Sequence, residues 1–260
     1  MSKTILITGS SSGIGRATAR FFQQQGWNVI ATMRSPEREQ SFNDRDTMLV
    51  TRLDVTEPAS IESAVKAGLT RFGRIDVLLN NAGFGAYGLL EATPLESIRR
   101  EFDTNVLGML ATTKGVLPHF RATRAGVIVN IASMGGKFAF PLGSLYHGTK
   151  FAVEGLSEAL SYEMAPGMIN TGFNKALDFS NDENLPEYQE LVQKVMAGFA
   201  EAQKRASPPE AVAEIVYEAV TDGTDRLRYT VGKDAEAMLT ARNTQDDAAF
   251  VKGMRDQLGL

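Results

Sequence analysis

The chain contains no cysteine, only two histidines and a single tryptophan. The missing cysteine excludes disulfide bonds, thiolate metal sites and a cysteine nucleophile. The two histidines, His119 and His147, offer few imidazole ligands, so we expect no metal centre. Basic residues are not in excess either, because 27 Lys and Arg stand against 31 Asp and Glu, a net charge of −4. We therefore expect a small-molecule substrate and no nucleic-acid partner.

Long apolar runs are also absent. The apolar stretch near the N-terminus ends at glycines after residue 8 and is too short for a signal segment or a membrane span. We therefore expect a cytoplasmic protein without membrane association. With 260 residues, of which 43% are hydrophobic, the chain can bury one large core. We expect a single domain over residues 1–260.

Short apolar runs alternate with amphipathic helical patterns along the chain. The runs predict strands at 4–8, 28–33, 48–55, 76–80, 127–131 and 227–231. The amphipathic patterns predict helices at 14–25, 60–72, 96–120, 146–164, 207–220 and 234–260. This alternation is typical of βαβ units in an α/β fold with a doubly wound, Rossmann-like parallel sheet, which binds its ligands at the carboxyl ends of the strands.

A glycine-rich turn follows the first predicted strand. Residues 8–15 have the spacing Gly-x-x-x-Gly-x-Gly, and a helical pattern begins directly after them. Glycines at such a turn let the backbone approach a pyrophosphate at the positive end of the helix. By itself the turn is also compatible with an ordinary strand-to-helix loop, but its place in a βαβ unit favours a dinucleotide site. Its candidate contacts are Gly9, Ser11, Ser12, Gly13, Ile14 and Gly15.

The end of the second predicted strand bears on the choice of cofactor. Sites for NAD usually have an acidic residue there to bind the adenosine ribose, whereas this chain has Arg34. Arg34, together with Arg16, could bind a 2′-phosphate, which favours NADP (NADPH) over NAD. The alternative is a solvated surface arginine. Further candidate contacts follow the third and fourth strands: Asp54, Val55, Asn81, Ala82 and Gly83.

These motifs resemble those of the short-chain dehydrogenase/reductase family. The family has a Thr-Gly-x-x-x-Gly-x-Gly turn, an Asn-Asn-Ala-Gly strand end and a Tyr-x-x-x-Lys motif, which match residues 8–15, 80–83 and 146–150. It also places a serine 13 residues before the tyrosine and an asparagine 28 residues before the serine, and these match Ser133 and Asn105. The resemblance implies a cofactor half over about residues 1–130, followed by a catalytic and substrate half over about residues 131–260.

The resemblance also implies a role for each catalytic residue. A phenol with a pKa of about 10 needs a nearby positive charge to exchange its proton near neutral pH. Lys150 would supply that charge to Tyr146 and also hold the nicotinamide ribose. Ser133 would bind the substrate oxygen, so that proton transfer through Tyr146 accompanies hydride transfer. Asn105 would hold a water that links Lys150 to solvent. Alone, the Tyr and Lys pair would also be compatible with an ordinary helix surface.

The segments that vary with substrate in this family are apolar here. They are the loops after Ser133 and Gly83 and the segment 173–205. Together with the residues around Arg34, which are similar to those of hydroxysteroid and retinol-type members, they predict a lipophilic ketone, aldehyde or alcohol as substrate. The last segment contains a stripe of apolar residues at helical spacing, which could form a lid over a pocket or a helix packed on the core. These residues are Tyr188, Leu191, Val192, Val195, Met196 and Phe199.

One segment departs from the family pattern. The family places a strand before a Pro-Gly-x-x-x-Thr segment near the nicotinamide, matched here by Pro166, Gly167, Ile169 and Thr171. The predicted helix to residue 164 leaves no room for that strand. If the chain joins these segments directly, an interior strand position of the sheet would be empty. We therefore expect the natural protein to have further residues between about Glu163 and Pro166 that this sequence does not contain.

Two functions follow from these observations. The first is an NADP(H)-dependent oxidoreductase that interconverts a ketone or aldehyde with an alcohol. The alternative is a cofactor-binding regulator without turnover, which the short segment after Glu163 favours. Because many family members associate through the helices that carry Asn105 and Tyr146, the resemblance also implies a homodimer or homotetramer.

Overall fold

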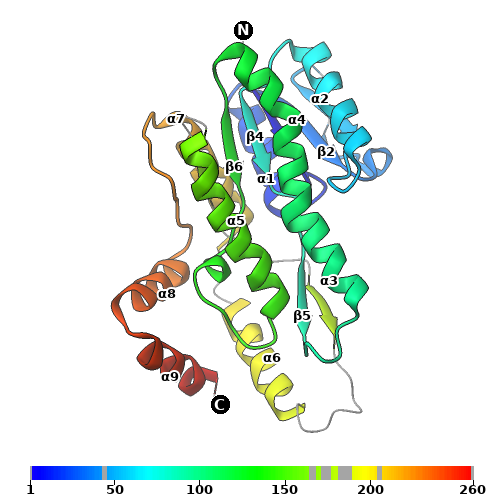
Figure 1. The fold of residues 1–260 in the computed structure, drawn as a ribbon. Helices are drawn as coiled ribbons and strands as arrows, with labels where there is room; N and C mark the ends of the chain where they lie inside the picture. The colour runs from blue at the N-terminus through cyan, green and yellow to red at the C-terminus, as the bar shows by residue number, and fades with distance from the viewer. Residues whose placement is uncertain are drawn as a thin grey trace.

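The fold is built on a six-stranded parallel sheet with the strand order β3-β2-β1-β4-β6-β7 (Figure 1). The computed structural model describes residues 2–42, 46–163, 168–170, 177–180, 189–203 and 207–258. The strands are β1 (Thr4–Ile7), β2 (Asn28–Met33), β3 (Met48–Arg52), β4 (Val77–Asn80), β6 (Val127–Asn130) and β7 (Met168–Asn170). The predicted doubly wound, Rossmann-like α/β fold is confirmed.

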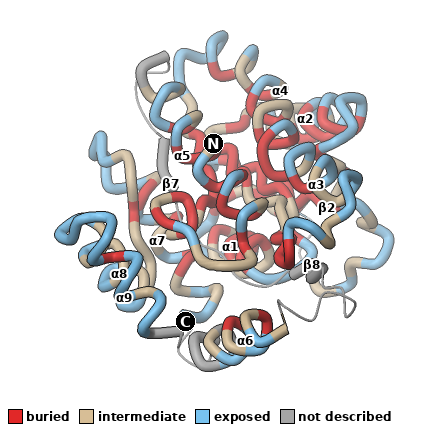
Figure 2. Tube along the Cα trace, turned by 60° about the horizontal axis from the view of Figure 1, so that its bottom comes forward, coloured by how far each residue is buried: buried red, intermediate tan, exposed pale blue. Residues whose placement is uncertain are grey.

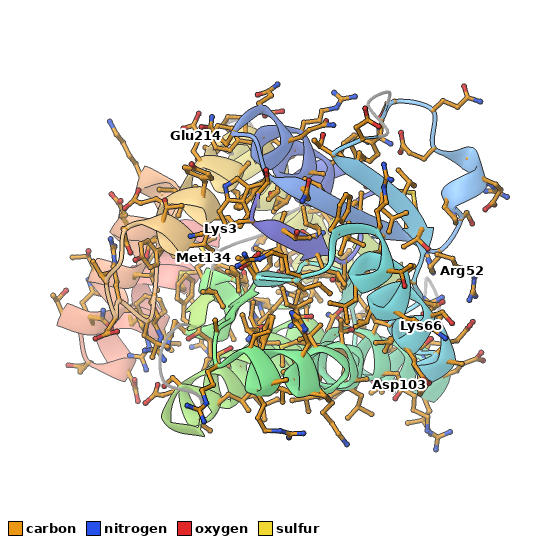
Figure 3. The ribbon with its side chains drawn as sticks, turned by 90° about the horizontal axis from the view of Figure 1, so that it is seen from above. Lys3, Arg52, Lys66, Asp103, Met134 and Glu214 are labelled. Atoms are coloured by element: carbon orange, nitrogen blue, oxygen red, sulfur yellow. The ribbon has the colours of Figure 1, made fainter. Side chains whose placement is uncertain are left out.

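Helices cover both faces of this sheet. One face carries α1 (Gly13–Gln24) and α7 (Pro209–Thr221), and the other carries α2 (Pro58–Phe72), α4 (Gly108–Thr123) and α5 (Ser144–Glu163). Figure 3 shows Glu214 of α7 and Lys66 of α2 on opposite sides of the strands. Because successive strand residues point to opposite faces, Ile5 packs in the core under α1 whereas Leu6 packs in the core under α2. Burial on both faces explains why the strands are apolar throughout.

The helix predicted for residues 96–120 is a longer run that includes a π-helical turn. It begins as α3 (Leu95–Phe102), continues through five π-helical residues (Asp103–Leu107) and becomes α4. Such turns occur mostly as single interruptions of α-helices and are frequent at functional sites. In this turn Asn105 and Val106 are buried.

The position beside β6 is filled, which corrects one prediction. The strand β7 pairs in parallel with β6, from Ile128 opposite Met168 to Asn130 opposite Asn170. A parallel connection needs a crossover of a dozen or more residues, and the 20 residues of α5 supply it. The predicted empty strand position is therefore wrong, and the reason for expecting further residues between Glu163 and Pro166 is removed with it.

The strand predicted at residues 227–231 does not form, which is a second correction. This segment, although described, has no regular secondary structure. A strand needs a neighbour with a matching row of N–H and C=O groups, and β7 offers only three residues. The segment is held by Tyr229 instead, whose buried ring packs in the core near α7 and whose hydroxyl donates to the Asp222 carboxylate.

Smaller elements complete the chain. Two of them, β5 (Gly85–Gly88) and β8 (Leu177–Ser180), form a separate parallel pair. The others are two short 3-10 turns, η1 (Pro36–Arg38) and η3 (Met134–Gly136), and the helices α6 (Gln189–Gln203), α8 (Lys233–Thr244) and α9 (Asp247–Leu258). Figure 1 shows β5, α6, α8 and α9 in the half of the molecule away from the N-terminus, and Figure 2 shows that α8 and α9 are mostly exposed.

Among the described residues, no helix is both long enough and apolar enough to cross a membrane.

Candidate active site

The glycine-rich turn between β1 and α1 is held by the end of β4. The side-chain Nδ2 of Asn81 donates to the Thr8 carbonyl at 2.9 Å and to the Gly9 carbonyl at 3.0 Å. The backbone N–H groups of Asn81 and Ala82 donate to the Thr8 hydroxyl at 2.9 and 3.0 Å. A Cβ on Gly15 would lie 2.4 Å from the Gly9 carbonyl oxygen, so this close approach requires glycine.

The outer side of the turn fits the pyrophosphate of a dinucleotide. Ser11, Ser12 and Gly13 are exposed where α1 begins, and Ile14 is buried beneath them. Ser12, the N-cap residue, makes no side-chain capping hydrogen bond within the described chain, and a Cβ on Gly13 would meet no atom within 4 Å. The start of α1 is therefore open to solvent at residues 11–13, where the positive end of the helix favours an anion.

Two charged residues lie at the adjacent ends of β2 and β3. Arg34 is exposed directly after β2, and Asp54 lies two residues after β3. Burial raises the pKa of Asp54, but hydrogen bonds from the Thr56 N–H and hydroxyl, at 3.0 and 2.7 Å, and the charges of Arg34 and Arg52 outweigh it and lower the pKa. Asp54 is therefore an ionised acceptor beside the Arg34 cation, and Val55 after it is buried.

Arg16, the second predicted phosphate ligand, already has an anionic partner. Its guanidinium lies 2.8 Å from the Glu39 carboxylate, whose side chain is almost completely buried. Burial raises the pKa of Glu39, but hydrogen bonds from Ser41 and the Arg16 charge together lower it. A cofactor phosphate would have to compete with Glu39 for Arg16, whereas Arg34 is exposed.

Tyr146 and Lys150 lie together on the buried side of α5. They are 4% and 6% exposed, and the Lys150 Nζ lies 5.7 Å from the centre of the Tyr146 ring. The ammonium donates to the Ile131 carbonyl at 2.8 Å, directly after β6. Burial lowers the pKa of Lys150 to about 8, although the Glu101 carboxylate opposes this change. The lysine is thus a buried cation held against a tyrosine ring.

The Tyr146 hydroxyl is buried and has no hydrogen-bond partner among the described residues. Burial raises the pKa of this phenol, the nearby Ser133 hydroxyl lowers it, and Glu101 raises it further. The Ser133 oxygen itself accepts a hydrogen bond from the Gly135 N–H at 3.0 Å. A buried polar group without a partner costs about 1–3 kcal/mol, which a ligand oxygen at this point would relieve.

Asn105 connects the end of β4 to α5. Its Oδ1 accepts from the Phe84 N–H at 3.0 Å, while its Nδ2 donates to the Phe84 carbonyl at 2.7 Å and to the Thr149 hydroxyl at 3.2 Å. A Cβ on Gly83 would lie 2.9 Å from this Oδ1, so glycine permits the close contact. The structure therefore brings Asn105, Tyr146, Lys150 and Ser133 into one cluster.

Two buried residues join this cluster that the sequence analysis did not select. Glu101 is fully buried, accepts from the Ala86 N–H at 3.0 Å, and lies four residues before Asn105 on the same helical run. Tyr87 of β5 places its ring 5.3 Å from the Tyr146 ring. The spacing of four residues was the available signal for Glu101, since residues that far apart share a helix face.

The remaining predicted residues are only partly described. Pro166, Gly167 and Thr171, three predicted cofactor contacts, lie outside the described residues, as does Tyr188 of the apolar stripe. Ile169 lies in β7, paired with Val129. In α6, Val192 and Val195 are buried whereas Met196 is exposed. Part of the stripe therefore packs on the protein.

A cavity of about 500 Å³ lies between the end of β6 and α8. Ser133 and Met134 form one wall, and Met134 is labelled in Figure 3. Another wall is ionic, because Glu154 lies 2.8 Å from Lys137 and 2.9 Å from Arg228. The cavity therefore reaches Ser133 of the cluster.

Comparison with known proteins identifies the family. The family model for short chain dehydrogenases matches residues 3–175, and the chain belongs to this family. An uncharacterized oxidoreductase of Schizosaccharomyces pombe is 42% identical over 237 residues, which cover 88% of this chain and all of the relative. A 3-ketodihydrosphingosine reductase of Bacteroides thetaiotaomicron is 42% identical over 179 residues, 65% of each chain. The protein is therefore an oxidoreductase of the short-chain dehydrogenase family.

Solved structures agree with this assignment. A short-chain dehydrogenase from Streptomyces avermitilis superposes with a TM-score of 0.81 at 30% identity, covering 100% of this chain and 99% of that one. ElxO with NADP bound has a TM-score of 0.74 at 26% identity, with 91% and 100% covered. A 3-ketoacyl-(acyl-carrier-protein) reductase from Brucella melitensis complexed with NADH has a TM-score of 0.70 at 26% identity, with 88% and 96% covered. Similar structures thus bind either nicotinamide cofactor.

The buried state of Lys150 can be measured directly. We expect its NMR signal in lysine-labelled protein to titrate near pH 8, and the variant Lys150→Met identifies the signal by its loss. Because the folded pKa lies below the ordinary value of 10.5, the unfolded chain binds more protons between these two pH values. The Lys150 contribution to the free energy of unfolding should therefore rise from about pH 8 to 10.5, and Lys150→Met should lack this rise. Titration of Lys150 at its ordinary pKa would contradict its burial as a cation.

Proposed function

We propose that the protein is an NADP(H)-dependent oxidoreductase that interconverts a ketone or aldehyde with the corresponding alcohol. The observation that carries this proposal is the buried Tyr146 hydroxyl, which has no partner among the described residues and lies beside Lys150 and Ser133. A substrate oxygen is the partner that fits this position. Membership of the short-chain dehydrogenase family supports the same chemistry.

The residues of the cluster would divide the work as follows. The bound cofactor supplies or accepts the hydride at the substrate carbon. In the reducing direction Tyr146 donates its proton to the substrate oxygen, and the Lys150 ammonium stabilises the phenolate that is left. The Ser133 oxygen already accepts from Gly135, so its own proton can point to the same substrate oxygen. In the oxidising direction the proton returns to Tyr146.

We propose NADP as the cofactor because of the residue that follows β2. Arg34 is exposed there, at the position where an acid would bind the adenosine ribose of NAD, and can pair with a 2′-phosphate. Lys150 and Tyr146 would contact the nicotinamide ribose. The other proposed contacts are Gly9, Ser11, Ser12, Gly13, Ile14, Gly15, Asp54, Val55, Asn81, Ala82, Gly83 and Ile169.

Aromatic side chains beside Tyr146 and in the loop after Ser133 support a lipophilic substrate. The Tyr87 ring lies against Tyr146, and Phe138 and Phe140 pack edge to face at 5.1 Å in the loop after Ser133. The related 3-ketodihydrosphingosine reductase is named for a ketone substrate, which is the same class of reacting group. We propose a ketone or aldehyde with an apolar body as the substrate.

A cofactor-binding regulator without turnover is the alternative. It is favoured by the short β7 and by the absence of a strand at the described residues 227–231. NADPH oxidation in the presence of any lipophilic carbonyl would remove this alternative.

The role of Tyr146 predicts a separation between turnover and binding. Tyr146→Phe should lower kcat by about a thousandfold or more, since it removes the proton donor, and should still bind NADPH. Steady-state kinetics and NADPH fluorescence measure the two effects. The matched control is Tyr217→Phe, in the core between α1 and α7, which should keep wild-type kcat. More than about a tenth of wild-type kcat in Tyr146→Phe would show that another group carries the proton.

The role of Arg34 predicts a change in cofactor discrimination. Arg34→Ala should weaken NADPH binding by roughly 10- to 150-fold, the value of one charged hydrogen bond of about 1.5–3 kcal/mol, with little effect on NADH. Titration calorimetry with both cofactors measures the difference. Arg38→Ala, an equal charge change in the neighbouring turn η1, is the control. If Arg34→Ala weakens both cofactors alike, Arg34 does not bind the phosphate.

We also propose a homodimer or homotetramer formed through α4 and α5. Leu107 and Phe151 on these helical runs are 57% and 47% exposed, so an apolar surface is available there. Light scattering at micromolar concentration should find an oligomer, and Phe151→Glu should shift it toward monomer. The control Val251→Glu, at an equally exposed position of α9, should leave the oligomer intact. A wild-type protein that is entirely monomeric would contradict this assembly.

A further inference from the structure

The loop after β6 is folded around the side chain of His147. This imidazole is 2% exposed and belongs to α5, directly after Tyr146. Its Nδ1 lies 2.9 Å from the Gly135 carbonyl oxygen, and its Nε2 accepts a hydrogen bond from the Phe140 N–H at 3.0 Å. The ring therefore joins two points of the loop, five residues apart, to one position of α5.

These two bonds define the state of the imidazole. The Phe140 N–H can only donate, so Nε2 must be the acceptor, and the Gly135 carbonyl can only accept, so Nδ1 must carry the proton. The ring is then neutral, with the proton on Nδ1. Burial lowers the pKa of His147, against a smaller rise from the Gly135 bond, which agrees with a neutral ring. Since both nitrogens are bonded to the backbone, His147 has no nitrogen left to act as a general base.

Glycine is required at two positions where the loop packs against the ring. A Cβ on Gly135 would lie 2.6 Å from the His147 Nδ1, and a Cβ on Gly143 would lie 2.6 Å from its Nε2. Leu142 has a φ of 64°, a left-handed conformation that is uncommon for leucine, and its carbonyl accepts from the Gly88 N–H at 2.7 Å. The loop thus keeps a strained and closely packed path around the imidazole.

Gly135 links this arrangement to the candidate catalytic cluster. Its carbonyl accepts from His147, while its own N–H donates to the Ser133 hydroxyl oxygen at 3.0 Å. The bond from Gly135 occupies the Ser133 oxygen as an acceptor and leaves the hydroxyl proton to point elsewhere. A displacement of Gly135 would therefore change the direction of the Ser133 proton.

We propose that His147 is a positioning residue that orients Ser133 through Gly135 and separately, through Phe140, holds the loop after Ser133 in the shape that binds the substrate. This inference rests on the function proposed above, in which Ser133 binds the substrate oxygen. It assigns different effects to the two ring nitrogens. The Nδ1 bond controls the rate of the chemical step through Ser133, and the Nε2 bond controls substrate binding through the part of the loop around Phe140.

Two substitutions of His147 test the roles of its two ring nitrogens separately. The amide of asparagine reaches the place of Nδ1, so His147→Asn can keep the bond to the Gly135 carbonyl and loses the one from Phe140. The longer glutamine reaches the place of Nε2. His147→Gln can therefore accept from the Phe140 N–H but loses the bond to the Gly135 carbonyl. We expect His147→Asn to raise KM for the carbonyl substrate and keep kcat within roughly threefold, and His147→Gln to lower kcat by about tenfold or more.

The other histidine of the chain provides the matched control. The Nε2 of His119 accepts from the Ile75 N–H at 3.1 Å, so it also bonds a backbone donor. His119 belongs to α4, and among the described residues its hydrogen bonds and ring contacts involve none of the cluster. His119→Asn should leave both kcat and KM within about twofold of wild type. Equal losses of kcat in His147→Asn and His147→Gln, or wild-type kcat in His147→Gln, would overturn the proposal. NADPH binding by each variant establishes that it is folded.

A measurement on the wild-type protein tests the same arrangement without any substrate. Nitrogen-15 NMR should find the His147 ring neutral with its proton on Nδ1, and hydrogen exchange should find the Phe140 amide protected. A ring protonated on Nε2, or a rapidly exchanging Phe140 amide, would overturn the proposal even if the variants fail to fold. A wild-type protein that turns over no carbonyl, but shows the expected ring and amide, would instead count against the proposed function.

Discussion

The rest of the site depends on how the buried Lys150 ammonium is held. A charged group is expensive to remove from water, and this one is held between the Tyr146 ring and the Ile131 carbonyl at the end of β6. Tyr146 belongs to α5, as Lys150 does, but the Ile131 carbonyl reaches the ammonium only when α5 has packed on the sheet. The site is therefore a product of the completed fold, and the cluster cannot assemble from α5 alone.

Side-chain amides continue this coupling on the other strands. Asn81 bonds the glycine-rich turn to the end of β4, and Asn105 bonds the segment after β4 to α5. An amide side chain has both donors and an acceptor, so one residue can bond two backbone groups that make no hydrogen bond to a neighbouring strand. The loops at the carboxyl ends of β1 and β4 and the start of α5 are therefore connected to one another as well as to the sheet.

The sequence was informative where local pattern decides the structure. Apolar strands and amphipathic helices follow from burial on both faces, and most elements from β1 to α5 lie where they were predicted. The spacing of Asn105, Ser133, Tyr146 and Lys150 also predicted one cluster, which the geometry shows. Features decided by distant partners were missed. The predicted strand at 227–231 does not form because the neighbouring strand is too short to pair with it. The contacts of Glu101 with Ala86 and of His147 with Gly135 depend on how loops distant in the sequence pack together.

The pair of Arg16 and Glu39 gives the dinucleotide site a counter-ion of its own. When no cofactor is bound, the carboxylate keeps the guanidinium in place and spares the protein an unpaired cation in a partly buried position. In the proposed NADP(H) complex the same carboxylate would compete with the 2′-phosphate for this guanidinium. Under that proposal Glu39 would limit how tightly Arg16 binds a cofactor that has to be released after each reaction cycle.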